Sequence, residues 1–325
     1  MFSRKNQPYS DNADRLVLAV STRSLFNMEE YHKIFESNGQ AGFDEFQVQH
    51  ETDLLEPGVS FQLVRKMRYL IDKNMGDVVI LSRNSPAASL RVWNSIIHYD
   101  LRIERGAFTS GAPRMHYLRA FHANLFLSAD LNEVRDALRD GIPAALCCAT
   151  EAPLKIIPDA PSNVMTPTEP GTGQDIPSVS SITSVPDVIR VAIDADSVIF
   201  SNEADQVFQQ QGFDAFINHE VECAKNPLPP GPFQPFINAL CTVRRVCPET
   251  IRIGIFTSRS APTHERIIRT LHAWGISVDE IFFLGGMPKM LFLAGWHPDI
   301  FFDDNSLNIE SAIASHVPAA QVVKN

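Results

Sequence analysis

The sequence predicts an α/β protein built on a doubly wound parallel β-sheet. Short, continuously apolar runs alternate with stretches of helical periodicity, and the alternation occurs both before and after a proline-rich segment. Runs of this kind are typical of parallel strands that are buried on both faces. They are Leu16–Val20, Val78–Leu81, Ile189–Ile193, Ile251–Phe256, Ile281–Leu284 and Ile300–Phe302. Ligands of such a sheet bind at the carboxyl ends of its strands.

The proline-rich segment predicts two domains. The chain has 325 residues, which is more than one hydrophobic core usually serves. Seven of its 22 prolines fall between Thr150 and Asp187, among Ser, Thr and Gly and without a hydrophobic period. This composition is typical of a linker. We therefore predict one domain over 1–149, a linker over 150–187 and a second domain over 188–325.

Helical segments are expected at two places in the second domain. Ser260 is expected to cap a helix with Pro262 in its first turn, because Ile267 and Leu271 recur at helical spacing. The stretch 201–235 is too long for a simple turn and is expected to form a small helical cap. Most of the phenylalanines in and beside it are expected to be core residues, although such rings also stack on nucleobases.

Composition and charge exclude several classes of function. The chain has 28 Lys and Arg against 38 Asp and Glu, a net charge of −10, and no run of basic residues, so nucleic acid is not an expected partner. No stretch approaches the ~20 apolar residues of a membrane helix, and the amino terminus lacks the apolar core of a signal peptide. We therefore expect a cytoplasmic protein without membrane contact. The five cysteines form no C-x-x-C pair, so they predict neither a disulfide framework nor a zinc site.

Four polar motifs follow apolar runs of the second domain, at the edge where parallel strands end. They are Asp194-Ala195-Asp196, Thr257, Lys289 and Asp303-Asp304. Each motif alone is commonly a solvated turn, a helix cap or a surface group. Together they predict a phosphoryl-transfer site, because carboxylates hold Mg²⁺, a hydroxyl and an ammonium bind phosphoryl oxygens, and a carboxylate can attack phosphorus.

At these residues the sequence resembles the haloacid dehalogenase superfamily, whose motifs are D-x-D-x-[TV], a strand-end Thr or Ser, a Lys and an acidic pair. Three longer phrases further resemble the cytosolic 5'-nucleotidase type I family: NSIIHYDL at 94–101, NLFLSAD at 124–130 and IFFDD at 300–304. The family usually has Gly where this chain has Ala195. The resemblance implies a superfamily-like α/β sheet with a small cap at about 201–235.

The resemblance also implies hydrolysis of a nucleoside 5'-monophosphate, AMP or a related nucleotide, through an aspartyl-phosphate and with Mg²⁺. Asp194 is the expected nucleophile and Asp196 the acid/base. The expected metal ligands are Asp194, Asp196 through its backbone carbonyl, Asp303 and Asp304. The expected phosphate-binding residues are Thr257, Ser258 and Lys289.

The first domain resembles the second at its glycines, prolines and histidines, under shifts of 173 and 175 positions. It is therefore expected to be a degenerate copy of the same α/β unit. Five positions of the first domain are equivalent to site residues of the second. They are Ser21 (equivalent to Asp194), Arg23 (to Asp196), Ser82 (to Thr257), Arg114 (to Lys289) and Ser128 (to Asp303).

These arginines and hydroxyls cannot hold Mg²⁺, but they suit a phosphate. We therefore hypothesise a nucleotide effector site in the first domain, and the family resemblance indicates ADP or ATP. The alternative is that Arg23 and Arg114 pair with local carboxylates and that this half serves only as a packing partner or a lid for the other.

Two other functions stay open. One is a superfamily phosphatase that acts on a sugar phosphate or another phosphorylated metabolite. The other is a non-catalytic nucleotide-binding regulator, which is disfavoured because all four motifs are complete. A second copy of the chain, in a homo-oligomer, is counted among the expected partners.

Overall fold

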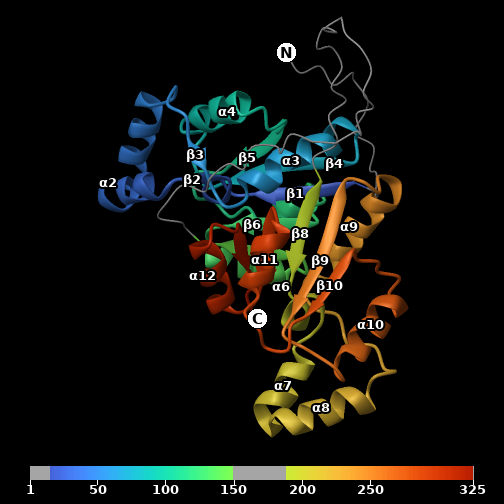
Figure 1. The fold of residues 1–325 in the computed structure, drawn as a ribbon. Helices are drawn as coiled ribbons and strands as arrows, with labels where there is room; N and C mark the ends of the chain where they lie inside the picture. Colours follow the sequence, from blue (N-terminus) through green and yellow to red (C-terminus); the bar gives the residue numbers. More distant parts are fainter. Residues whose placement is uncertain (1–14, 149–187, 325) are drawn as a thin grey trace, which may run out of the picture.

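The computed structural model describes residues 15–148 and 188–324, and the predicted linker at 150–187 lies outside the described residues (Figure 1). The strands before this gap are β1 (Leu16–Val20), β2 (Phe26–Asn27), β3 (Glu56–Pro57), β4 (Gly76–Ser82), β5 (Arg105–Phe108), β6 (Leu125–Ser128) and β7 (Ala144–Cys147). Those after it are β8 (Ile189–Ile193), β9 (Ile251–Thr257), β10 (Glu280–Phe283), β11 (Ile300–Asp303) and β12 (Ala319–Gln321).

The helices connect these strands. In the first half they are α1 (Thr22–Leu25), α2 (Glu29–Gln49), α3 (Phe61–Asp72), α4 (Ser89–His98), α5 (His116–Ala120) and α6 (Leu131–Arg139). In the second half they are α7 (Glu203–Gln211), α8 (Phe213–Glu222), α9 (Gln234–Val246), α10 (His264–Ala273), α11 (Met290–Trp296) and α12 (Ser306–Ala314).

Ten of the strands form one sheet in the order β10-β9-β8-β11-β12-β7-β6-β1-β4-β5 (Figure 1). Every neighbouring pair is parallel except β12 and β7, which pair antiparallel where the two halves meet. The predicted α/β class with a mostly parallel sheet is confirmed. The short strands β2 and β3 pair separately.

The strand order is the same on both sides of the β7–β12 junction. We number the strands of this sheet along the chain within each half, leaving out β2 and β3. From the outer edge to the junction the order in both halves is then third, second, first, fourth, fifth. The first strand of each half, β1 or β8, therefore lies between the second and the fourth. This arrangement places the carboxyl end of β8 beside those of β9 and β11, where the four motifs were predicted to meet.

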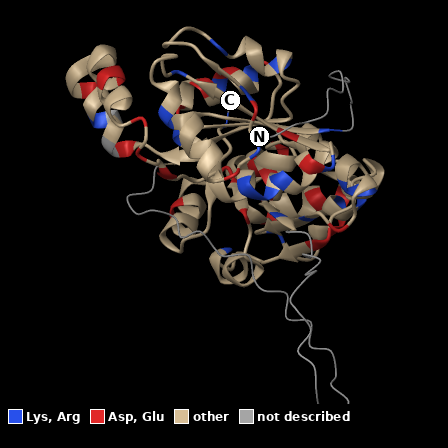
Figure 2. Cartoon of the chain, turned by 90° about the horizontal axis from the view of Figure 1, so that it is seen from above, with Lys and Arg blue, Asp and Glu red and all other residues tan. Residues whose placement is uncertain are grey.

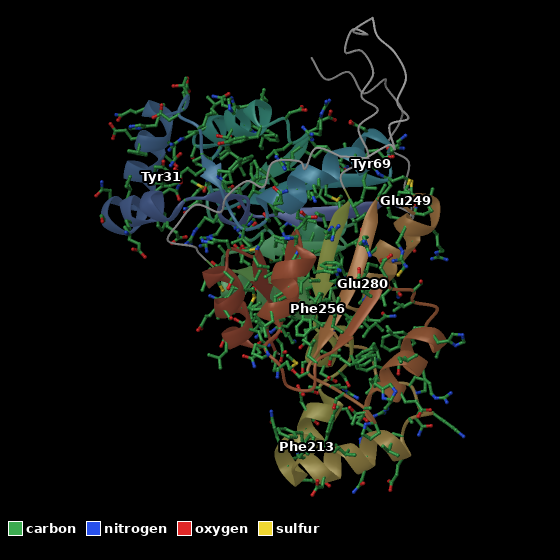
Figure 3. The ribbon with its side chains drawn as sticks, in the orientation of Figure 1. Tyr31, Tyr69, Phe213, Glu249, Phe256 and Glu280 are labelled. Carbon is green, nitrogen blue, oxygen red and sulfur yellow. The ribbon has the colours of Figure 1, made fainter. Side chains whose placement is uncertain are left out.

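Helices cover both faces of the sheet and bury its apolar side chains. One hydrophobic core extends over one face through both halves and contains Leu18 and Ile193. On the opposite face each half has a smaller core. The one in the first half contains Phe126. The one in the second half contains Phe256, which is labelled in Figure 3. Continuous burial on both faces explains why the strands read as uninterrupted apolar runs.

The predicted helical stretch after β8 contains α7 and α8, which extend beyond the strand ends (Figure 1). Gly212, at φ +85°, separates the two helices in a backbone conformation that favours glycine. Phe233 and Phe236 are fully buried against the sheet, as predicted. Phe213 is 60% exposed on α8 (Figure 3), so this ring is an exception to the expected core positions.

The expected start of the helix near Ser260 is also wrong. Helix α10 begins at His264, after Thr263. The hydroxyl of Thr263 donates to the carbonyl of Ser260 at 2.9 Å, so residues 260–263 form a turn of their own. Ser260 therefore lies one turn too early to cap the helix.

Charged residues of both signs are interspersed over the helices (Figure 2). In the parts of the chain that the structure describes, no helix is both long enough and apolar enough to span a bilayer.

Candidate functional site

The register of the central strands brings two of the predicted motifs together. Ile193 of β8 pairs with Ile255 of β9 on one side and with Phe302 of β11 on the other. Asp194 and Asp303 therefore follow on adjacent strands. The backbone N–H of Asp194 donates to the carbonyl of Phe302 at 2.8 Å, which fixes the two strand ends to each other.

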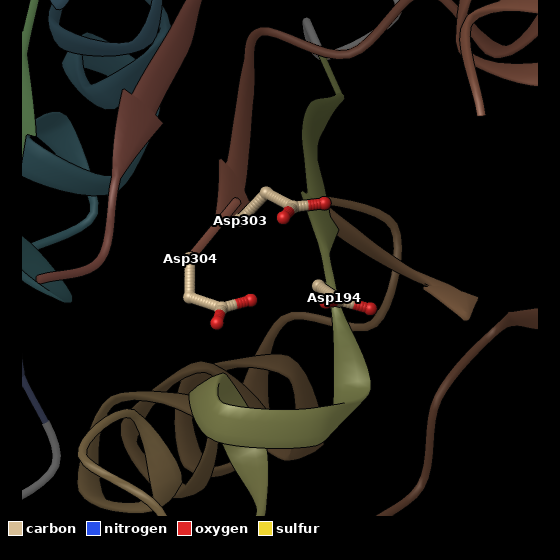
Figure 4. Close-up of side chains that lie close together, drawn as sticks. All are labelled: Asp194, Asp303 and Asp304. Atoms are coloured by element: carbon tan, nitrogen blue, oxygen red, sulfur yellow. The ribbon is translucent and has the colours of Figure 1, made fainter. Parts of the chain in front are cut away.

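Three carboxylates form a cluster at this edge. Asp194, Asp303 and Asp304 each offer an oxygen atom, and these atoms lie within 4.8 Å of one another (Figure 4). Asp194 and Asp303 are buried, with 8% and 0% of their surface exposed. Oxygen donors at this spacing could hold a metal ion, and hard divalent cations such as Mg²⁺ prefer carboxylates.

A buried ammonium group lies among the carboxylates. Lys289, at the start of α11, places its Nζ atom 2.7 Å from Asp194 Oδ1 and 2.6 Å from Asp303 Oδ2. Burial lowers the pKa of Lys289, but the two carboxylates outweigh burial, so the pKa is raised and the group stays charged. Burial raises the pKa of both Asp194 and Asp303, and Lys289 opposes this shift.

Residues around the cluster hold the acidic pair in place. Asp303 accepts hydrogen bonds from the Asn305 backbone N–H at 2.8 Å and from Asn308 Nδ2 at 3.0 Å. Asp304 pairs with Lys324 at 2.6 Å. Neither Asn308 nor Lys324 was predicted, although Asn308 lies five residues after Asp303, on the first turn of α12, a position from which it can reach back to the strand end.

The segment after Asp194 turns sharply away from the sheet. Asp194 Oδ1 accepts from the N–H of Ala195 at 2.7 Å, and Ser197 adopts a left-handed conformation with φ +63°. The hydroxyl of Ser197 donates to Asp205 of α7 at 2.7 Å. This bond joins the first motif to the helices beyond it, so the position of α7 is linked to that of Asp194.

The carboxylate of Asp196 is held outside the cluster. It accepts two hydrogen bonds from Arg259, at 2.8 Å from Nε and 2.6 Å from Nη2. Arg259 also pairs with Glu220 of α8. Neither Arg259 nor Glu220 was predicted from the sequence as part of the site. Arg259 is one polar residue in the loop after β9, Glu220 is one charged residue in a helical stretch, and neither belongs to a recognisable motif.

The predicted phosphate-binding residues differ in their surroundings. Thr257 ends β9, is 1% exposed and accepts a hydrogen bond at Oγ1 from the Arg259 N–H at 3.2 Å. Ser258 is exposed. Lys289 reaches the carboxylate cluster as described above, so the structure brings a buried hydroxyl residue, an ammonium and three carboxylates to one edge of the sheet.

The five residues predicted as an effector site line a single cavity of about 250 Å³ in the first half. They are Ser21, Arg23, Ser82, Arg114 and Ser128. Both arginines have carboxylate partners, as in the alternative interpretation: Arg23 pairs with Glu29 at 2.7 Å, and Arg114 pairs with Glu133. Burial lowers the pKa of Arg114, and Glu133 opposes this shift.

The fold and the site define an α/β protein with a buried carboxylate and ammonium cluster at the strand ends. The model of the 5'-nucleotidase family matches residues 8–157 and 173–325. The chain belongs to this family. It is 30% identical to human (Homo sapiens) cytosolic 5'-nucleotidase 1B over 329 residues, which cover 95% of this chain and 49% of that protein. The chain thus spans about half the length of this relative. No solved structure matches the chain.

Replacing Lys289 by Met is expected to destabilise the fold by about 3–5 kcal/mol at neutral pH, because two buried carboxylates lose their cation. The pKa of Lys289 is raised above 10.5, its ordinary value in the unfolded chain. Its contribution to the free energy of unfolding is therefore fully present below pH 10.5 and is lost as the pH rises through the pKa of the folded state. The deficit should shrink as the pH falls, since Asp194 and Asp303 have raised pKa values and become neutral early.

Urea denaturation of wild type and of Lys289→Met at several pH values measures this difference in the free energy of unfolding. Lys324→Met is the matched control, because the side chain of Lys324 is half exposed and surface ion pairs contribute about 0–1 kcal/mol. Equal losses in the two variants at neutral pH would show that Lys289 is not the counter-charge that the buried carboxylates need.

Proposed function

We propose that the chain hydrolyses nucleoside 5'-monophosphates, AMP or a related nucleotide, to nucleoside and phosphate. The observation that carries the proposal is the cluster of Asp194, Asp303 and Asp304 around Lys289 in a chain of the 5'-nucleotidase family. The name of the human relative supports the same reaction class. Carboxylates and an ammonium at strand ends are the groups that phosphoryl transfer needs.

In the proposed reaction Asp194 attacks the phosphorus atom and forms an aspartyl-phosphate, and the bond from phosphorus to the ribose 5'-oxygen breaks. Asp196 gives that oxygen a proton and then accepts one from the water that hydrolyses the intermediate. Thr257, Ser258 and Lys289 bind the phosphoryl oxygens. In the resting structure Arg259 occupies both oxygens of Asp196, so one of these hydrogen bonds must break before proton transfer.

The donor set fits Mg²⁺. Asp194, Asp303 and Asp304 supply carboxylate oxygens, and no His or Cys takes part in the cluster found among the described residues. We propose that these three carboxylates and the backbone carbonyl of Asp196 hold the ion. When bound, Mg²⁺ would neutralise charge on the phosphoryl group and orient it.

We also propose that the two halves are copies of one haloacid dehalogenase-like unit, with α7 and α8 as the small cap of the catalytic copy. The common strand order supports this. So do matching left-handed residues: His122 and His297 at φ +55° and +51°, and Gly111 and Gly286 at +82° and +85°. The division at 1–149, 150–187 and 188–325 follows from the same proposal.

The substrate class is tested by measuring phosphate release from a panel of nucleoside monophosphates and sugar phosphates, with Mg²⁺ and after EDTA treatment. We expect release from nucleotides, loss with EDTA and recovery with Mg²⁺, because all proposed ligands are oxygens. Preference for sugar phosphates would support the phosphatase alternative instead. Binding without turnover of any ester would support the regulator alternative.

Asp194→Asn is expected to abolish phosphate release, because an amide does not attack phosphorus. Asp196→Asn is expected to lower turnover by roughly 10²–10⁴-fold, the usual contribution of a positioned acid or base. Steady-state rates with AMP measure both effects. Asp214→Asn on α8 is the control. Near-normal turnover by Asp194→Asn would rule out the covalent mechanism.

A second proposal is that the first half binds a nucleotide effector, ADP or ATP. The supporting observation is the cavity that all five predicted residues line. Among the described residues, Arg114 Nε and Asn84 Nδ2 are buried there without a hydrogen-bond partner. Phe43 and Met28 from the α2 side give the cavity an apolar wall.

We also propose that the chain associates with a second copy of itself. Light scattering, which gives the molar mass in solution, tests this.

ADP should bind with a Kd raised about 10–100-fold in Arg23→Ala and Arg114→Ala, since a hydrogen bond to a charged group contributes about 1.5–3 kcal/mol. Calorimetric titration and AMP hydrolysis at several ADP concentrations measure this. Arg139→Ala is the control, because Arg139 is 70% exposed on α6 and does not line the cavity. If both variants bind and respond as wild type does, the effector proposal is wrong and the arginines only pair locally.

A further inference from the structure

A chain of alternating charges leads from the sheet edge into the helices beyond it. Asp196 accepts two hydrogen bonds from Arg259, whose Nη1 donates to Glu220 of α8. The other oxygen of Glu220 accepts from Arg266 of α10 at 2.8 Å. Four charged side chains from four separate segments are thus connected in series, and Arg259 is the one that touches both Asp196 and α8.

The two central groups of this series, Glu220 and Arg259, are buried and remain charged. Glu220 is 1% exposed and Arg259 is 5% exposed. Burial raises the pKa of Glu220, but Arg259 and Arg266 outweigh burial, so the pKa is lowered. Burial lowers the pKa of Arg259, and Asp196 and Glu220 reverse this shift, so the pKa is raised. Even a paired buried charge loses much of its hydration free energy, so apolar residues of similar volume would stabilise the fold as well, and stability alone is weak ground for these charges.

The first half provides an internal comparison. Arg91 of α4 is buried and donates to Gln47 of α2, as Arg266 of α10 donates to Glu220 of α8. Gln47 and Glu220 each lie eight residues after a glycine with positive φ, at 39 and 212. An arginine that anchors the helix beyond the first strand therefore occurs in both halves.

The rest of the charge chain does not recur in the described residues of the first half. At the three equivalent positions that half has Arg23 for Asp196, Asn84 for Arg259 and Gln47 for Glu220. In that half Arg91 contacts the neutral side chain of Gln47, and the ion pair of Arg23 with Glu29 lies separately, at the start of α2. The series from the first motif through Arg259 to Glu220 is thus present in the half that also has the carboxylate cluster, and the contact that Arg266 shares with Arg91 does not explain it.

We propose that Arg259 and Glu220 are positioning residues for Asp196. Arg259 fixes the plane of the Asp196 carboxylate through two parallel hydrogen bonds, a geometry that favours one orientation. One of these bonds is broken while Asp196 carries the proton that it donates. During this step Glu220, on α8, holds the guanidinium of Arg259 in place. The carboxylate of Asp196 therefore keeps its second hydrogen bond to Arg259 and its orientation.

This inference rests on the proposed function, in which the phosphorus to 5'-oxygen bond breaks, its electron pair passes to that oxygen, and Asp196 protonates it. An analogue of AMP with sulfur in place of the bridging 5'-oxygen separates positioning from folding. A thiolate leaves without a proton, so its departure does not need Asp196.

The experiment compares the single-turnover rate of leaving-group release from AMP and from the bridging-sulfur analogue in wild type, Arg259→Lys and Glu220→Gln. This rate reports the formation of the aspartyl-phosphate and excludes its hydrolysis, in which Asp196 serves both substrates alike. We expect the rate for AMP to fall about 10–100-fold in both variants, the usual effect of losing a positioning partner. The rate for the sulfur analogue should change little, and KM for AMP should stay near that of wild type. Glu220→Asp replaces Glu220→Gln if the latter does not fold, with a smaller change of the same kind.

Arg266→Lys is the matched control, because Arg266 binds the same Glu220 but does not touch Asp196. It should lower thermal stability and leave the oxygen-to-sulfur ratio of the single-turnover rates at the wild-type value. Equal losses with both substrates in Arg259→Lys and Glu220→Gln, or the same ratio change in Arg266→Lys, would overturn the proposal.

A crystal structure of Arg259→Lys tests the inference without turnover. We expect the Asp196 carboxylate to rotate away from its wild-type direction, and an unchanged carboxylate would refute the positioning role. If wild type releases no phosphate from AMP, the proposed function has failed, and this structure still decides whether Arg259 orients Asp196.

Discussion

The candidate site depends on one buried cation among buried carboxylates. Asp194 and Asp303 extend from adjacent strands into a region with almost no solvent access, where two negative charges would be costly. Lys289 contacts both. The position of α11, which begins directly after Lys289, is therefore linked to the state of the carboxylates. A phosphoryl group or a metal ion that enters the site would meet two carboxylates that already share one buried cation.

The sheet supplies the geometry for this cluster. In each half the first strand lies between the second and the fourth, so residues just after three strands share one edge. In the second half these residues are mostly carboxylates, and in the first half they are hydroxyls and arginines. One topology thus supports two edges of different charge, joined through the antiparallel β7–β12 pair into a single sheet.

Sequence patterns predicted the parts of the site that are local. Asp194 and Asp303 each follow a buried apolar strand, and parallel order was enough to place them together. Arg259 could not be predicted in its contact with Asp196, because that contact depends on how the loop after β9 folds toward α8. The β7–β12 junction was not predicted either. Strand β12 has three residues, Ala319–Gln321, too few to show a period.

The measurement that tests the central claim most directly is the identity of the side chain that carries the phosphoryl group. Enzyme quenched during turnover of a nucleoside monophosphate can be reduced with borohydride, which converts an aspartyl-phosphate into homoserine, and the modified position is read by peptide mass spectrometry. The account predicts homoserine at position 194 and none when substrate or Mg²⁺ is omitted. Homoserine at another aspartate, or none at position 194 while phosphate is being released, would contradict it.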